Sequence, residues 1–441
     1  MTLKINDDSI IKIKIIIIII LILCIYKNCK KLAIINNSNT YLKFNNRAKT
    51  KFFHKKIKNV NDLIDNLNNY SNKTNKTNII FHDYFISKTC FDKNSYILFQ
   101  YFLKNNIHIP YYIINKNSDF YKYLRKNNNI KNLILFDSKK LSSFYRNLYI
   151  YLKDAKIIIA SYTILFLQEI SAKVPYIKFL KIDHGIRHFK IYIAKYEIIS
   201  QLKNKTKIIS SSPYEYEHLI NELNYSSRQI YNASLIKYER FQYIKRNKNE
   251  KKCILISFTY RSYSKKKFEK SLYKMNLFTL LNDKELINDL YNRNINLIYV
   301  PHHEEINLGK KYSQKYFKYA IIGNQKSLDH YIEHCSLLIT DFSSLSFDFM
   351  FQNKPVLFYP IDKNDKINYF GKADAIYPNN TLFFGNYFSD KNSLVNEIKY
   401  YTKNNFKIGY KLRNKYKSVF FIKTNIINSV VEIIKDIINN K

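Results

Sequence analysis

The chain has 441 residues, with 73 Lys and Arg against 34 Asp and Glu, which gives a formal net charge of +39. Apolar residues make up 46% and aromatic residues 16%, which excludes an intrinsically disordered chain. A mean hydropathy of −0.35 excludes a multi-pass membrane protein, and six glycines are too few for a Gly-rich dinucleotide-binding or phosphate-binding loop. The length predicts two or three domains.

The positive charge is spread along the chain instead of being gathered into one arm. Part of it follows from a composition dominated by Lys, Asn and Ile. The functional interpretation is attraction to a polyanion, a class that includes nucleic acid, anionic lipid and phosphate-rich substrates. Because neither a zinc finger nor an RNP motif is present, we expect no nucleic-acid partner.

The cysteines are five in number, scattered, and without a Cys-x-x-Cys pair. This pattern argues against a disulfide framework and against a zinc site, and it favours a reducing compartment. The five are Cys24, Cys29, Cys90, Cys253 and Cys335.

Residues 1–31 are predicted to associate with a membrane. They contain the apolar run Ile15–Tyr26, which has lysines on both sides and is shorter than the roughly 20 residues of a full span. Three interpretations stay open: a short membrane anchor, an interfacial segment and a buried strand. Residues 32–77 follow as a polar arm with one predicted helix near Val60–Tyr70.

Residues 78–244 alternate between β-rich apolar runs and segments with helical spacing. Such alternation predicts a parallel sheet covered by helices on both faces. Helices are predicted over Tyr96–Lys104, Leu141–Lys153 and Tyr214–Leu223. The predicted strands are Ile79–Phe85, Ile107–Ile114, Leu133–Phe136, Ile157–Ser161, Tyr176–Ile182 and Ile208–Ser212.

A charged segment without periodicity, residues 245–252, is predicted to be a linker, and a second alternation occupies residues 253–441. An amphipathic helix over Ile422–Asn440 ends the chain and is expected to cross back to the first domain. Two Rossmann-like domains with a cleft between them form a GT-B-like α/β architecture, which is the predicted fold class. The predicted strands of the second domain are Cys253–Phe258, Ile295–Val300, Tyr319–Ile322, Leu337–Thr340 and Pro355–Tyr359.

Ligands of open parallel sheets bind beyond the carboxyl ends of the strands, and a histidine follows a predicted strand there in each half. His184 precedes Gly185, and His302 follows Pro301. A histidine has a pKa near neutrality, so His184 is a candidate general base, with a hydrogen-bonded loop histidine as the alternative. Although His303 and two acids follow His302, no third ligand has useful spacing, so we expect no metal site.

The segment Ser336–Met350 predicts a buried strand, a polar turn and the start of a helix. The hydroxyl and carboxyl groups of Asp341, Ser343 and Ser344 suit the cap of that helix. Free backbone N–H groups at a helix start also bind phosphate without any glycine. Plain capping is the alternative, and it needs only one of these side chains.

These segments resemble the CDP-glycerol glycerophosphotransferase family, which includes the teichoic-acid primases and polymerases and their capsule relatives. The resemblance covers about residues 79–400, and the block Thr340–Tyr359 is its most specific part. The matching motifs are His184-Gly185 with Lys190, Phe258-Thr259-Tyr260-Arg261, Pro301-His302, Thr340-Asp341-Phe342-Ser343-Ser344, Phe347-Asp348-Phe349, Lys354-Pro355, Asp362 and Lys93-Asn94-Ser95.

The resemblance implies transfer of a polyol phosphate, most simply glycerol phosphate, from a CDP-activated donor to an acceptor hydroxyl, with CMP leaving and no cofactor. His184 is then the base, while His302 and Arg261 stabilise charge on the pyrophosphate. The residues implied to bind the CDP and its phosphates are Lys190, Lys237, Thr259, Arg261, Thr340, Asp341, Ser343, Ser344 and Asp348.

The expected partners are a CDP-polyol, a lipid-linked or glycan acceptor and an anionic membrane surface. The expected location is the cytoplasmic face of a bacterial membrane. Two alternatives remain open at this point. One is a GT-B glycosyltransferase of capsule or lipopolysaccharide synthesis, which would turn over UDP- or CMP-sugars. The other is a non-catalytic, membrane-tethered protein that binds polyanions without any dependence on nucleotide.

Overall fold

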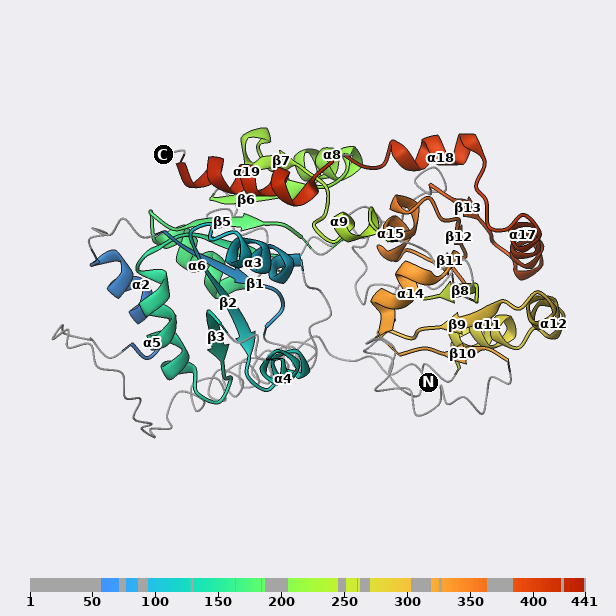
Figure 1. Cartoon of the computed structure of the whole chain (residues 1–441), viewed down its shortest axis with the longest axis horizontal. Helices are drawn as coiled ribbons and strands as arrows, with labels where there is room; N and C mark the ends of the chain where they lie inside the picture. The colour runs from blue at the N-terminus through green and yellow to red at the C-terminus, as the bar shows by residue number, and fades with distance from the viewer. Residues whose placement is uncertain are drawn as a thin grey trace, which may run out of the picture.

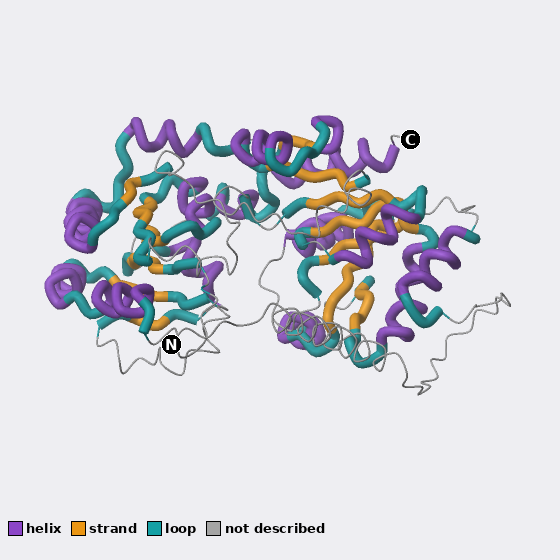
Figure 2. The backbone as a smooth tube through the Cα atoms, turned by 180° about the vertical axis from the view of Figure 1, so that it is seen from behind, coloured by secondary structure: helices purple, strands orange, loops and turns teal. Residues whose placement is uncertain are grey.

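The computed structural model of the chain describes fourteen segments, and every structural statement below concerns these residues. They are residues 57–70, 77–85, 94–127, 131–162, 164–183, 185–186, 205–244, 251–259, 261, 270–302, 319–324, 327–362, 384–421 and 424–439. Figures 1 and 2 show two lobes, each built around a sheet.

The first sheet has seven parallel strands in the order β3-β2-β1-β4-β5-β6-β7. Its central strands β1 and β4 are almost completely buried, and most of their side chains are Ile, Phe and Ala, as expected for a sheet covered on both faces. The strands are β1 (Asn78–His82), β2 (Ile109–Asn115), β3 (Leu133–Phe136), β4 (Ala155–Ala160), β5 (Lys178–Lys181), β6 (Thr206–Ser210) and β7 (Ile230–Asn232).

Helices cover both faces of the first sheet. The helices α2 (Val60–Asn68), α5 (Leu141–Leu152) and α6 (Leu165–Lys173) share one apolar cluster with one face. The helices α3 (Asn94–Lys104) and α4 (Asp119–Lys126) share the cluster on the other face. The remaining helical segments are α8 (Pro213–Asn221), the 3₁₀ turn η1 (Ser227–Gln229) and α9 (Tyr238–Phe241).

The second sheet has six parallel strands in the order β10-β9-β8-β11-β12-β13. Its strands are β8 (Cys253–Ile256), β9 (Asn296–Tyr299), β10 (Ile321–Ile322), β11 (Leu337–Thr340), β12 (Val356–Phe358) and β13 (Asn386–Tyr387). Its helices are α11 (Leu272–Leu281), α12 (Lys284–Asn292), α14 (Leu328–His334), α15 (Leu345–Phe351), α17 (Lys391–Lys403) and α18 (Tyr410–Lys417). The predicted α/β class with two parallel sheets is therefore confirmed.

The last helix, α19 (Ile426–Asn439), returns to the first lobe, although it follows the second sheet in the chain (Figure 1). Val430, Val431, Ile434 and Ile437 are buried in the cluster that contains α3 and one face of the first sheet. Lys178 of β5 also donates to the carbonyl of Ile437 at 2.5 Å. The helix thus joins the two lobes by packing, as an amphipathic segment must bury its apolar face.

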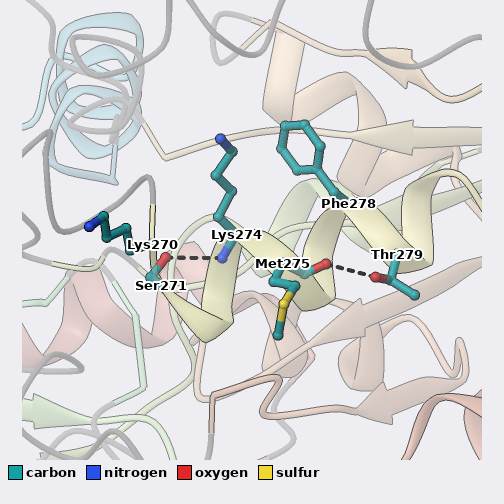
Figure 3. Close-up of a pocket in the computed structure, with 6 residues that line it drawn as sticks. All are labelled: Lys270, Ser271, Lys274, Met275, Phe278 and Thr279. Carbon is teal, nitrogen blue, oxygen red and sulfur yellow. Dashed lines mark hydrogen bonds between the residues drawn. The ribbon is translucent and has the colours of Figure 1, made fainter.

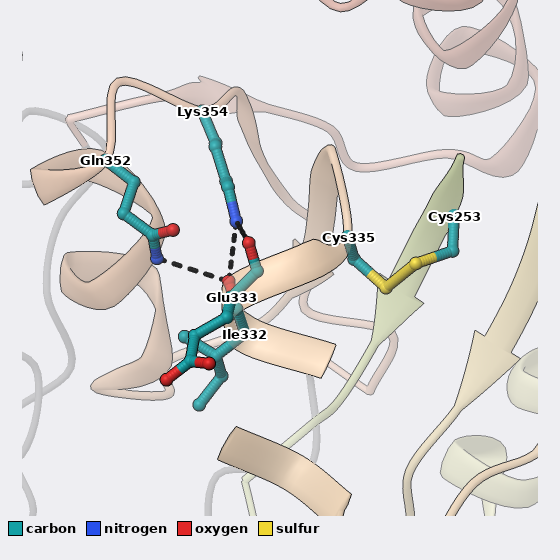
Figure 4. Close-up of a disulfide and its surroundings, with 6 residues drawn as sticks. All are labelled: Cys253, Ile332, Glu333, Cys335, Gln352 and Lys354. Carbon is teal, nitrogen blue, oxygen red and sulfur yellow. Dashed lines mark hydrogen bonds between the residues drawn. A yellow bond between two sulfur atoms is a disulfide. The ribbon is translucent and has the colours of Figure 1, made fainter. Parts of the chain in front are cut away.

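Cys253 and Cys335 form a disulfide, so the cysteine pattern, which argued against disulfides, was misleading for this pair (Figure 4). Cys253 begins β8, and Cys335 lies two residues before the neighbouring parallel strand β11. Parallel pairing brings the starts of these two strands together, with a Cα–Cα distance of 4.6 Å across a sequence separation of 82 residues. The spacing of the cysteines in the sequence does not reveal this pairing. That spacing therefore gives no support to a reducing compartment.

Lys354 lies beside this disulfide and caps the carboxyl end of α14 (Figure 4). Its ammonium group donates to the carbonyls of Ile332 and Glu333 at 2.6 and 2.7 Å. The last carbonyls of a helix have no partner within the helix, so a buried cation there satisfies them. The Lys-Pro pair before β12 therefore holds α14 against the second sheet.

Among the described residues, no helix has both the length and the apolar character needed to cross a membrane. The predicted membrane-associating segment, residues 1–31, lies outside the described residues.

Candidate functional site

The described residues that the sequence predicted for the site, except Lys237 and Asp348, follow strands at their carboxyl ends. Gly185, of the predicted His-Gly motif, follows β5, Thr259 and Arg261 follow β8, and His302 follows β9. The turn Thr340–Ser344 leaves β11. His184, Lys190 and Tyr260 lie outside the described residues.

The turn after β5 touches the second lobe. A Cβ atom added at Gly185 would lie 3.2 Å from the Ser344 hydroxyl oxygen and 3.3 Å from the Ser344 Cβ. These distances are tighter than ordinary contacts, so the absence of a side chain at Gly185 permits the close approach. The His-Gly motif of the first lobe and the serine turn of the second lobe are thereby adjacent.

The turn Thr340–Ser344 is held mainly by its own first two residues. The Thr340 hydroxyl donates to the carbonyl of Ser257 at 2.6 Å. Asp341 accepts from the backbone N–H groups of Phe342 and Thr259, at 2.6 and 2.9 Å. Both side chains are fully buried, so they connect β11 to β8 and shape the turn.

Ser343 and Ser344 stand where this turn becomes α15. The Ser343 hydroxyl accepts from the backbone N–H of Leu345 at 3.3 Å. Ser344 occupies the N-cap position but makes no side-chain capping bond. The predicted helix start is confirmed, and one of the two hydroxyls is left to face Gly185 instead of the helix.

Arg261 was predicted to stabilise pyrophosphate charge, but the structure buries it inside the second lobe with 1% exposure. Its Nε and Nη2 donate to both oxygens of Asp362, at 2.8 and 2.7 Å. Nη2 also donates to Asp341 at 2.7 Å, and Nη1 donates to the Thr259 carbonyl at 2.5 Å. In this arrangement Arg261 holds two strand-end carboxylates in place and has no surface to offer a ligand.

Lys237 and Asp348 were both predicted to bind the donor, yet they bind each other. The Lys237 ammonium lies 2.8 and 2.9 Å from the two carboxylate oxygens of Asp348. Burial raises the pKa of the Asp348 carboxyl, and the Lys237 charge opposes that rise. The pair joins the N-cap of α9 to α15, so it connects a helix of the first lobe to the second lobe.

Thr259 has the hydroxyl best suited to a ligand. Its side chain is 5% exposed, and Oγ1 has no hydrogen-bond partner within the part of the chain that the structure describes. A buried hydroxyl without a partner costs free energy, so it favours a ligand or water that satisfies it. His302 lies half-buried at the end of β9.

A buried cluster after β1 was not predicted. Asp83 accepts from the hydroxyls of Ser161 and Tyr112, the latter at 2.7 Å, and from the backbone N–H of Ser95 at 3.1 Å. Burial raises the pKa of Asp83 and lowers the pKa of the adjacent His82 to about 4. Its position directly after a buried strand was the one sequence signal that could have found it.

Asn94 was noted only as part of a motif, and it makes two contacts close to the site. Its Nδ2 donates to the Asp183 carbonyl and its Oδ1 accepts from the backbone N–H of Lys237, each at 3.1 Å. Asn94 therefore connects the β5 turn with α9.

The structure also contains a pocket of about 380 Å³ at the start of α11, and none of the residues above lines it (Figure 3). Its lining comes from Lys270, Ser271, Lys274, Met275, Phe278 and Thr279. Within the described segments, no group of three or more His, Cys, Asp or Glu side chains is arranged to hold a metal ion.

The family model described as CDP-Glycerol:Poly(glycerophosphate) glycerophosphotransferase matches residues 66–425. A curated relative, Minor teichoic acid biosynthesis protein GgaB of Bacillus subtilis (strain 168), is 27% identical over 384 residues, a match that covers 79% of this chain and 39% of that protein. The chain thus spans well under half the length of this relative.

Two solved structures have the same fold at low sequence identity. The Wall Teichoic Acid Polymerase TagF has a TM-score of 0.60 and 17% identity, with 87% of this chain and 94% of that chain covered. The S. aureus MnaA-UDP co-structure has a TM-score of 0.53 and 13% identity, with 83% and 97% covered. Because the family model matches most of its length, this chain belongs to the CDP-glycerol:poly(glycerophosphate) glycerophosphotransferase family.

Proposed function

We propose that the chain transfers glycerol phosphate from CDP-glycerol to a hydroxyl group of a teichoic-acid-like or capsular cell-surface polymer and releases CMP. One observation carries the proposal. Gly185, which directly follows the candidate base His184, lies against Ser344 in the serine turn of the second lobe. A base and a phosphate-binding turn that come from facing sheets suit a transfer reaction between an acceptor and a donor in a GT-B-like arrangement.

In the proposed reaction, the acceptor hydroxyl oxygen attacks the phosphorus that is bonded to the glycerol. The bond from this phosphorus to the CMP oxygen breaks, and CMP leaves with the electron pair. His184 takes the proton of the attacking hydroxyl, which is the role of a general base. No cofactor enters the balance, since one phosphoester bond forms as one phosphoanhydride bond breaks.

The donor diphosphate is proposed to lie against the second lobe. The Thr259 hydroxyl, the Ser343–Ser344 turn and His302 are the groups assigned to it there, and Lys190 is assigned to it from the first lobe. Arg261, Thr340, Asp341 and Asp348 are buried and bonded to protein atoms, and Lys237, whose side chain is 18% exposed, is paired with Asp348. These residues therefore shape this surface instead of contacting the ligand. The negative charge that develops on the leaving CMP is stabilised by preorganised hydrogen-bond donors, and this role is proposed for the Thr259 hydroxyl and the serine turn.

The base is tested with His184→Ala. CMP release from CDP-glycerol, with a glycerol phosphate primer as acceptor, is expected to fall roughly 10²–10⁴-fold. The matched control is His330→Ala, which removes an exposed histidine of α14. A His184→Ala protein with full activity would refute the role of the base. UDP-sugars are tested as alternative donors, and turnover of a UDP-sugar in place of CDP-glycerol would establish the glycosyltransferase alternative.

The donor site is tested with the double variant Ser343→Ala and Ser344→Ala. Loss of hydrogen bonds to a charged group is expected to weaken CDP binding roughly tenfold or more, as measured by calorimetry. Ser418→Ala, at an exposed helix end, is the control. Unchanged CDP affinity in the double variant would remove the serine turn from the donor site.

We also propose that the protein acts at the cytoplasmic face of the membrane on a lipid-linked or glycan acceptor. The support is the net charge of +39, since each well-placed Lys or Arg contributes about 1 kcal/mol of attraction to anionic lipid. The apolar run Ile15–Tyr26 would add hydrophobic anchoring. Deletion of Met1–Lys31 is expected to release the protein from membranes at high salt, and a full-length protein that stays soluble at low salt would contradict this location.

A further inference from the structure

The motif Lys93-Asn94-Ser95 has no part in the donor or base assignments above, although its central residue lies close to both. Asn94 begins α3 and is 1% exposed. Both ends of its side-chain amide are engaged: Nδ2 donates to the Asp183 carbonyl, and Oδ1 accepts from the Lys237 N–H. A buried amide with both ends bonded fixes the relative position of the segments that it joins.

The first of these bonds acts on the peptide unit that leads into His184. The carbonyl of Asp183 belongs to the planar peptide group that it shares with the next residue. Asp183 has φ of 47°, a left-handed conformation that is uncommon for a residue with a side chain. The hydrogen bond from Asn94 to this carbonyl stabilises the conformation of Asp183, the residue directly before His184 in the chain.

The second bond connects the same amide to the second lobe. Lys237 is paired through its ammonium group with Asp348 on α15, the helix that begins directly after Ser344. The Asp183 turn, Asn94, Lys237 and Asp348 therefore form one continuous series of contacts. Through it, the peptide before His184 has a fixed place relative to the serine turn.

Asn94 is itself held rigidly. The backbone N–H of the next residue, Ser95, donates to Asp83 at the end of β1, and Asp83 also accepts from Tyr112. The start of α3 is thus bonded to the centre of the first sheet. A positioning side chain needs this kind of support, because displacement of a reacting group by about 1 Å can cost roughly 10²-fold in rate.

We propose that Asn94 is a positioning residue for the transfer reaction, and that its amide fixes the Asp183–His184 peptide relative to α9 and the serine turn. This inference rests on the proposed function, because it requires His184 as the base. Asparagine suits the position because one end of its amide donates and the other accepts. Aspartate keeps the acceptor for Lys237 but has no donor for the Asp183 carbonyl.

The test compares Asn94→Ala with Asn78→Ala. Asn78 is also buried, at 5% exposure, and its Nδ2 donates to the Tyr151 carbonyl at 2.9 Å, at the opposite end of β1 from Asp83. Both variants are expected to lower the melting temperature to a similar extent. Only Asn94→Ala is expected to lower kcat for CMP release, by roughly 10–100-fold, with KM for CDP-glycerol within about twofold of the wild-type value.

A double-mutant cycle separates positioning from a general loss of structure. If Asn94 acts through His184, then Asn94→Ala added to His184→Ala lowers the rate no further than His184→Ala alone. An additional 10–100-fold loss in the double variant would show that Asn94 acts elsewhere and would overturn the proposal. If Asn94→Ala fails to fold, Asn94→Asp takes its place, with the same expected loss of kcat and the same cycle.

The activity of the wild-type protein distinguishes failure of the proposed function from failure of the positioning role of Asn94. A wild-type protein that releases no CMP from CDP-glycerol overturns the proposed function together with the role of Asn94. An active wild-type protein whose Asn94 variants keep full kcat overturns the positioning role alone. Equal losses of kcat in Asn94→Ala and Asn78→Ala would also overturn it, because a structural effect would then account for both.

Discussion

In each sheet, a buried aspartate connects the carboxyl ends of two neighbouring strands, but the partners of the two aspartates differ. In the first sheet, Asp83 after β1 is bonded to Ser161 after the neighbouring strand β4. In the second, Asp341 after β11 is bonded to Thr259 and Arg261 after the neighbouring strand β8. Both bridges join the carboxyl ends of two central strands, where α/β proteins bind ligands.

The difference lies in what the partners can do. The side-chain partners of Asp83 are hydroxyls, and a hydroxyl can turn to donate or accept. The partners of Asp341 and Asp362 include a guanidinium group, which only donates. The bridge in the first lobe thus tolerates a change in charge, whereas the bridge in the second lobe, beside the proposed diphosphate site, requires fixed charges.

The largest expected effect is that of Asp362→Asn on stability. The amide would place an N–H donor against a guanidinium N–H donor and would remove one of the two carboxylates that balance buried Arg261. Breaking a buried ion pair in this way typically costs about 3–5 kcal/mol of unfolding free energy. Urea denaturation measures the loss.

The control for this variant is Asp329→Asn. Asp329 pairs with Arg240 at 3.3 Å but is 44% exposed, so its removal is expected to cost less than about 1 kcal/mol. A loss in Asp362→Asn no greater than that of the control would mean that the buried ion network does not hold the second lobe together.

The next effect concerns the covalent link between β8 and α14. The double variant Cys253→Ala with Cys335→Ala opens a loop with a sequence separation of 82 residues, and a disulfide that closes such a loop typically contributes about 2–4 kcal/mol. A thiol reductant is expected to lower the melting temperature of the wild-type protein but not of the variant. Equal melting temperatures with and without reductant would show that the wild-type pair is not bonded in solution.

The sequence predicted the strands well where apolar residues run together. Leu133–Phe136 and Leu337–Thr340 were predicted with the bounds that the structure gives to β3 and β11. The short edge strands β7 and β13 were not predicted, because three and two residues of mixed polarity carry no periodic signal. Helix positions between the strands of the second sheet were left largely unassigned, although α12 has a clear apolar face.

The sequence predicted that most candidate residues lie at the ends of strands, but it did not predict which side chains they contact. Residues after strands do gather at the two carboxyl edges, as topology requires. Lys237 and Asp348, however, were each assigned to the donor, and they pair with each other across 111 residues of sequence. Neither that pairing nor the burial of Arg261 is visible in a sequence, because both depend on which side chains the two lobes bring together.

The third prediction uses pH to probe the first lobe. Burial lowers the pKa of His82 from 6.5 to about 4. As the pH falls, His82 is therefore protonated in the unfolded chain at a higher pH than in the folded chain. The resulting contribution to stability is complete above pH 6.5 and is lost as the pH falls towards 4. Between pH 7 and pH 5 the wild-type protein is expected to lose about 2 kcal/mol from this group.

His82→Gln, which does not titrate, is the matched variant. Its unfolding free energy in urea is expected to change less between pH 7 and pH 5 than that of the wild-type protein, by the amount that His82 contributes. Identical changes in the two proteins would mean that His82 is not held neutral by burial after β1.

The smallest expected effect, that of Asp83→Asn, is the sharpest test of the comparison. An asparagine here keeps an oxygen for the Ser95 N–H and presents an amide to the Tyr112 hydroxyl, which can turn and accept. Burial also raises the pKa of Asp83, so a neutral side chain suits this site. The expected change in unfolding free energy is within about 1 kcal/mol, measured in urea beside Asp362→Asn. A loss in Asp83→Asn as large as that in Asp362→Asn would show that the first bridge also depends on a fixed charge, and the contrast between the hydroxyl and guanidinium bridges would then be lost.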